Sequence, residues 1–294
     1  MNFRKILVPL DGSELAERVV LPAIRIAEGM KAQVVLLTVV TPTPRPDRPG
    51  LVERAVQTSK YEAGLYLKSV RSHYLPAAVE VVTAVSTGQP ANAIIAYVQE
   101  NDVDLILMTT HGRSGLTRWS YGRVAEKVLR RAPCPTVILR SHQQIVPEGI
   151  KRILVPLDGS RLAEQALPPA HDIAAALGAE IVLLQAIEPM LPFPFAAANV
   201  AEEVETSPVW EYLTRVRIRL QAGGVTAHAE VVVGPVADAV IDYADSHQID
   251  LIVLSSLGSS GFQMWVFGSV AERVMQGAHC ATMVIRQEEA AQED

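Results

Sequence analysis

Two short segments of the chain carry the residue types that could do chemistry. PLDGS at 9–13 begins at the end of one apolar run. MTTHGRSGLTRWSYGR at 108–123 begins at the end of another. A carboxylate such as Asp11 accepts hydrogen bonds from hydroxyl or amino groups of a ligand. Glycines let backbone amides approach an anion closely, and a helix start adds free N–H groups and a favourable dipole. Together the segments indicate a site for a small phosphate-bearing ligand.

Both segments occur twice. KILVPLDGS at 5–13 returns within KRILVPLDGS at 151–160, and the second segment returns as LSSLGSSGFQMWVFGS at 254–269. A repeat of this length has the size of a whole domain. The sequence therefore predicts a tandem duplication, with domains at 1–141 and 150–287.

The repeated aspartates, Asp11 and Asp158, allow two interpretations. In the first, they cap the following helix together with Ser13 and Ser160, because Asp and Ser are favoured at helix N-caps. In the second, each carboxylate faces a crevice and accepts hydrogen bonds from a ligand. The residues alone leave both interpretations open.

The elements around these segments alternate between apolar strands and amphipathic helices. Strands are expected in the first half at 5–10, 33–40, 78–85, 104–110 and 136–140, with helices at 14–28, 51–74, 88–100 and 122–131. This order predicts an α/β fold, a doubly wound parallel sheet with helices on both faces. Such sheets bind ligands at the carboxyl ends of strands where the strand order reverses. The site is therefore expected just after the first and fourth strands of each half.

Composition and charge argue against several classes of function. The 294 residues carry a net charge of −6, with 49% hydrophobic and 5% aromatic residues, so we expect no nucleic-acid binding. The sequence also has no apolar stretch of transmembrane length and no signal-peptide pattern, which predicts a cytoplasmic protein that binds no membrane. Cys134 and Cys280 each precede an apolar run and are expected to be buried. No catalytic triad, metal-ligand cluster or Walker loop is present, so no catalytic or metal-binding residue is predicted.

The motifs together resemble the universal stress protein family. The resemblance rests on VPLDGS, HGRSGLTRW, a glycine opening the last helix and VAEKVLRRAPCPTVILR, and it covers both halves almost end to end. It implies two flavodoxin-like domains, each with a five-stranded parallel sheet of order 3-2-1-4-5. It also implies that the last strands of the two halves pair within the chain as a pseudo-dimer, and it leaves a further homodimer and protein partners open. The ligand it implies is an adenine nucleotide, ATP or else AMP or ADP, with Mg²⁺ as a candidate companion.

The family's nucleotide motif is Gly, two residues, Gly, nine residues, then Gly and Ser or Thr. In the first copy Thr109 and Arg123 depart from it, and in the second copy only Ser255 does. In the first copy the resemblance assigns ligand contacts to Pro9, Asp11, Val39, Met108, Thr109, His111, Gly112, Arg113, Ser114, Gly122, Arg123 and Val124. In the second copy it assigns them to Pro156, Asp158, Ala186, Leu254, Ser255, Leu257, Gly258, Gly268, Ser269 and Val270.

Two functions remain in competition. The first is a nucleotide-binding stress-response module in which ATP hydrolysis, if any, is slow. The second is a stress-response scaffold whose degenerate sites no longer bind nucleotide. If one site works, the retained Gly268 and Ser269 favour the second copy.

Overall fold

The computed structural model describes residues 3–42, 49–74, 78–110, 122–140, 149–188, 207–256 and 267–286. The chain divides into two compact units, Asn2–Ser141 and His142–Asp294. These units are termed domain 1 and domain 2.

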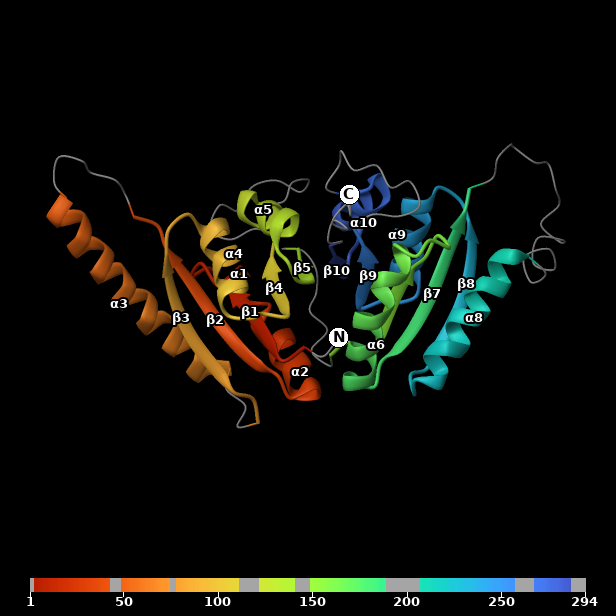
Figure 1. Cartoon of the computed structure of the whole chain (residues 1–294), viewed down its shortest axis with the longest axis horizontal. Coiled ribbons are helices and arrows are strands. Elements are labelled where there is room, and N and C mark those ends of the chain that lie inside the picture. Colours follow the sequence, from red (N-terminus) through yellow and green to blue (C-terminus); the bar gives the residue numbers. More distant parts are fainter. Residues whose placement is uncertain are drawn as a thin grey trace, which may run out of the picture. The chain divides into compact units, whose positions relative to one another are not determined.

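Domain 1 is built on a parallel sheet. Its strands are β1 Lys5–Pro9, β2 Gln33–Val40, β3 Val81–Thr87, β4 Leu105–Thr109 and β5 Thr136–Leu139 (Figure 1). They lie in the order β3-β2-β1-β4-β5, and each described neighbour pair runs parallel. This is the expected 3-2-1-4-5 order, which reverses direction between β1 and β4.

Helices connect these strands and cover both faces of the sheet. They are α1 Glu14–Glu17, α2 Val20–Met30, α3 Pro49–Tyr74, α4 Pro90–Glu100 and α5 Arg123–Arg131. Right-handed crossovers place α2 and α3 on one face and α4 and α5 on the other, and α4 packs against α5.

One helix expected from periodicity is divided in the structure. The pattern predicts a single helix over 14–28, but α1 ends at Glu17 and α2 begins at Val20. Pro22 lacks an N–H group and so cannot donate a helical hydrogen bond to the carbonyl of Arg18. The short α1 is thereby separated from the rest of the helix.

Domain 2 repeats the architecture. Its strands are β6 Arg152–Pro156, β7 Glu180–Ile187, β8 Ala227–Val233, β9 Leu251–Ser255 and β10 Ala281–Ile285, in the order β8-β7-β6-β9-β10. Its helices are the 3₁₀ helix η1 Ala163–Ala166, α6 Leu167–Leu177, α8 Pro208–Ala222, α9 Val236–Ser246 and α10 Ser269–Gly277.

Branched aliphatic residues and alanines fill the cores. Every residue of β4 and β9 is buried, as expected for strands covered on both faces. In domain 2, Leu154, Val240 and Val274 join β6, α9 and α10 in one cluster.

Cys134 is buried and Cys280 is partly buried, and burial raises the pKa of each thiol to about 12. Within the described ranges, no helix has the length and apolar character needed to cross a membrane.

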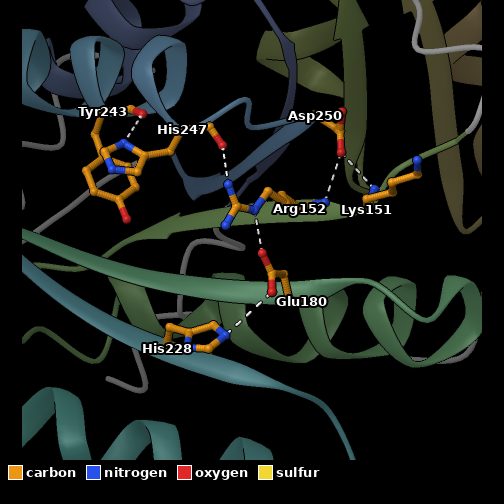
Figure 2. Close-up of polar contacts among 7 residues, drawn as sticks. All are labelled: Lys151, Arg152, Glu180, His228, Tyr243, His247 and Asp250. Carbon is orange, nitrogen blue, oxygen red and sulfur yellow. Dashed lines mark hydrogen bonds and ion pairs between the residues drawn. The ribbon is translucent and has the colours of Figure 1, made fainter.

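A carboxylate fixes the start of the first strand in each domain. Asp250 accepts hydrogen bonds from the backbone N–H groups of Lys151 and Arg152, at 2.7 and 2.9 Å (Figure 2). Asp104 does the same at the start of β1, at 2.8 and 2.9 Å. The amino ends of β1 and β4, and of β6 and β9, are thus tied together in the same way.

Candidate functional site

The turn after β1 is shaped by its aspartate. Asp11 Oδ1 accepts hydrogen bonds from the backbone N–H and the hydroxyl of Ser13, at 3.0 and 2.6 Å. Gly12 between them has φ +82°, a left-handed conformation that favours glycine. Ser13 Oγ accepts from the N–H of Ala16 at 3.1 Å, which makes Ser13 the N-cap of α1.

Domain 2 forms the same turn. Asp158 Oδ1 accepts from the N–H of Ser160 at 2.9 Å, Gly159 has φ +82°, and Ser160 Oγ accepts from the N–H of Ala163 at 3.1 Å. Ser13 therefore caps α1, whereas Ser160 bonds the first residue of η1, whose N-cap is Leu162. The aspartates close the turn, and both lie exposed at the carboxyl end of the sheet.

The fourth strands end beside a helix start. Thr109 and Ser255 close β4 and β9 and are buried. The N–H of Gly122 donates to the carbonyl of Thr110 at 2.8 Å, and that of Gly268 donates to Ser256 at 2.8 Å. Each glycine thus brings the chain back to the strand end before the helix begins. The intervening predicted residues His111, Gly112, Arg113, Ser114, Leu257 and Gly258 lie outside the described residues.

These helix starts have no side-chain cap. Gly122 and Gly268 are the N-caps of α5 and α10, and neither cap forms a side-chain hydrogen bond. The first-turn N–H groups of a helix have no acceptor within it, and the dipole adds partial positive charge. Both starts are therefore suited to an anion.

Gly268 is not required by the backbone. Its φ is −64°, which any residue adopts, and an added Cβ would lie 3.7 Å from the carbonyl oxygen of Ser256, an ordinary contact. The absence of a side chain at Gly268 instead keeps space open beside the start of α10.

A crevice of about 200 Å³ opens at this point in domain 2. Its walls are mainly apolar, with Asp158 from the turn after β6 and Ser269 at the start of α10 among its polar residues. The described lining is Pro156, Leu157, Asp158, Ala163, Val236, Leu254, Ser255, Ser256, Gly268, Ser269, Val270, Ala271 and Val274.

The crevice unites most of the predicted residues of the second copy that the structure describes. Ala186 is the exception, since it lies on β7 outside the lining. The sequence did not single out Leu157, Ala163, Val236, Ser256, Ala271 and Val274. Periodicity marks the helical members of this set as apolar, but it does not say that they border a ligand crevice.

The first-copy residues occupy the matching positions in domain 1. Pro9 and Asp11 end and follow β1, Val39 is half-buried near the end of β2, and Met108 is buried in β4. The start of α5 carries Gly122, an exposed Arg123 and a half-buried Val124. In the described parts of both domains, no group of three His, Cys, Asp or Glu side chains could hold a metal ion.

Fold and site define each domain as a flavodoxin-like α/β module with candidate ligand-contacting residues where the strand order reverses. The sequence model of the universal stress protein family matches residues 2–140 and again 149–286. The chain therefore belongs to the universal stress protein family, as a tandem protein with two family domains.

Individual relatives agree with this assignment. The chain is 34% identical over 139 residues to universal stress protein MJ0531 of Methanocaldococcus jannaschii, which covers 46% of this chain and 82% of the relative. It is 29% identical over 308 residues to universal stress protein Rv2623 of Mycobacterium tuberculosis, with 96% of both chains covered. The crystal structure of a universal stress protein from Archaeoglobus fulgidus superimposes with a TM-score of 0.74 at 19% identity, over 98% of this chain and 100% of that one. That structure shares the fold.

Proposed function

We propose that this tandem universal stress protein binds an adenine nucleotide, ATP or else AMP or ADP, in the crevice of domain 2 and at the matching position of domain 1. The observation that carries the proposal is the crevice itself. Its apolar walls lie between the carboxylate of Asp158 and the uncapped start of α10.

Each part of a nucleotide has a suitable environment there. A flat base fits between apolar walls such as those of Leu254 and Val236, and hydroxyl or amino groups can donate to Asp158. At about 200 Å³ the crevice is smaller than the roughly 300–1,000 Å³ typical of ligand pockets. We therefore place the nucleoside in the crevice and the phosphates at its rim, beside the first-turn amides of α10 and Ser269.

The lining favours binding over catalysis. Asp158 is the one ionisable side chain among the described lining residues, and that lining includes no lysine or arginine. Hydrolysis at this site would depend on helix amides and a dipole, so ATP turnover should be slow. Mg²⁺, if it takes part, would enter with the phosphates.

A second function, a scaffold without nucleotide, is favoured by Thr109 and Arg123. Thr109 replaces the first glycine of the family motif and is buried at the end of β4, and Arg123 stands where the motif has a hydroxyl. If these changes close the first site, domain 1 retains only an architectural function.

Titration of the full chain with ATP, ADP and AMP, with and without Mg²⁺, tests the proposal by calorimetry. We expect binding with millimolar or better affinity. Gly268→Val should abolish binding in domain 2, because its side chain occupies space beside α10 that the fold leaves open. Gly64→Val is the matched control, since a Cβ at Gly64 in α3 meets nothing within 4 Å. Absence of binding by all three nucleotides would leave the scaffold function in place of this one.

A further inference from the structure

A tyrosine of α3 reaches the turn after β1. The Tyr66 hydroxyl donates a hydrogen bond of 3.0 Å to Glu17 Oε1, and the contact is partly buried. The pKa of Tyr66 is raised well above its ordinary value by burial, by Glu17 and by the charge of Asp11, while a backbone hydrogen bond from Gly12 acts in the opposite direction. Tyr66 therefore contacts α1 through Glu17 and also interacts with Asp11 and Gly12 of the turn.

The helix that Tyr66 contacts is the one that continues the turn. α1 has four residues, Glu14–Glu17, and the N–H of Glu17 donates to the carbonyl of Ser13 at 3.2 Å. A helix this short has little stability of its own, because nucleation fixes several residues for few hydrogen bonds. Its position must come from tertiary contacts, of which the Tyr66–Glu17 hydrogen bond is one. Through Ser13 this contact extends to Asp11.

Domain 2 has the same tyrosine and glutamate, and an arginine pairs with the glutamate. Tyr212 and Glu164 match Tyr66 and Glu17 in the repeat. Glu164 pairs with Arg219 at 2.7 Å, and its charge and a side-chain hydrogen bond add to burial in raising the pKa of Tyr212. The carboxylate on η1 thus has an arginine partner in addition to the tyrosine. The equivalent of Arg219 in domain 1 is His73, so that arrangement is absent from the first copy.

We infer that Tyr66 is a positioning residue of domain 1, which holds the Asp11–Gly12–Ser13 turn through Glu17 so that Asp11 is oriented toward a ligand. The ligand part of this inference rests on the proposed function. The structural part, that Tyr66 restrains the turn, is independent of any ligand.

Amide hydrogen exchange of the full chain tests the structural part. Tyr66→Phe keeps the ring and removes the hydroxyl, so Gly12 and Ser13 amides should exchange roughly two- to tenfold faster, the value of one ordinary hydrogen bond. Tyr61→Phe is the matched control, because Tyr61 lies on the same helix and is 69% exposed. In domain 2, where Arg219 also holds Glu164, Tyr212→Phe should accelerate exchange of the Gly159 and Ser160 amides less than Tyr66→Phe accelerates that of Gly12 and Ser13. Equal exchange in Tyr66→Phe and Tyr61→Phe would overturn the inference.

A second pair of variants separates the hydrogen bond from the charge. Glu17→Gln retains an oxygen acceptor for the Tyr66 hydroxyl, whereas Glu17→Ala removes it. We expect fast exchange of the Gly12 and Ser13 amides in Glu17→Ala and near-normal exchange in Glu17→Gln. Equal effects of the two substitutions would contradict a hydrogen-bonded restraint.

Nucleotide affinity tests the ligand part, in a Gly268→Val background that leaves only domain 1 to bind. AMP and ATP are titrated against the parent, Tyr66→Phe, Asp11→Ala and the double variant. Tyr66→Phe should weaken binding by roughly two- to tenfold, and it should add nothing to Asp11→Ala if it acts through that carboxylate. An effect of Asp11→Ala without one of Tyr66→Phe refutes the positioning function alone. If the parent does not bind, the proposed function of domain 1 fails, while the exchange measurements still decide whether Tyr66 restrains the turn.

Discussion

At the scale of single residues, substitutions at Gly159 and Gly64 should affect stability with opposite sign. Gly159 has φ +82°, and a Cβ added there would meet nothing within 4 Å, so the effect of Gly159→Ala is backbone strain alone. This strain should lower the free energy of unfolding by about 1–2 kcal/mol. Gly64 lies inside α3 with equally open surroundings, and Gly64→Ala should raise it by about 0.5–1 kcal/mol. Urea denaturation of both variants checks the opposite signs, and a change of the same sign would show that packing dominates.

The residues of the turn also show what the sequence could and could not decide. PLDGS predicted a turn with a carboxylate at the strand end, and this turn is present in both copies. The motif could not tell whether Asp11 caps the helix together with Ser13 or faces a ligand, because an aspartate can accept from a nearby backbone N–H. In the structure the N-cap of α1 is Ser13, and Asp11 accepts from Ser13. Val236 escaped prediction because its place in the lining depends on how α9 crosses the sheet.

At the scale of elements, the amino ends of β6, β7 and β8 carry a ladder of polar side chains that domain 1 lacks. The Arg152 guanidinium pairs with Glu180 across the two strands, and Glu180 Oε2 lies 3.5 Å from His228 Nε2 (Figure 2). In domain 1 the register partners are Lys5 and Gln33, which cannot form this ion pair.

The ladder should make the stability of domain 2 depend on pH. The hydrogen bond from Arg152 holds the pKa of Glu180 below its ordinary value of 4.5. The contribution of Glu180 is therefore present above pH 4.5 and is lost as the pH falls through its lowered pKa. Because both partners are partly exposed, we expect less than about 1 kcal/mol. Thermal denaturation between pH 6 and 3 should show a shallower decline for Glu180→Gln than for the parent, and parallel curves would contradict the assignment.

Helix boundaries show where element-scale prediction is limited. The parallel sheet and most strand bounds follow from apolar runs and the alternation of elements, whereas the strand order is implied by the resemblance to the family. The division of the first helix into α1 and α2 follows from neither, because apolar spacing continues across Arg18 and Val19 while the hydrogen-bond ladder is interrupted by Pro22. That interruption creates the short helix on which the turn depends.

At the scale of the whole molecule, duplication has produced two domains with one architecture and unequal candidate sites. The start of α10 offers the hydroxyl of Ser269, whereas the start of α5 offers the exposed guanidinium of Arg123. A hydroxyl contributes a short-range hydrogen bond to phosphate, while a guanidinium contributes a charge whose effect extends into solvent. If both domains bind nucleotide, their affinities should therefore respond differently to salt.

The full chain should bind ATP at two sites of different affinity, and added salt should weaken binding at one site more than at the other. An exposed charge is screened at high ionic strength, so between 0.05 and 0.5 M NaCl the Arg123 site should lose up to about fivefold more affinity than the Ser269 site. Calorimetric titrations of Gly268→Val report the first site in isolation. Arg123→Ser in that background gives both sites a serine at the helix start, and it should reduce the salt dependence to that of domain 2. A salt response unchanged by Arg123→Ser would mean that the guanidinium does not contact the phosphates, and that the two sites differ through other residues.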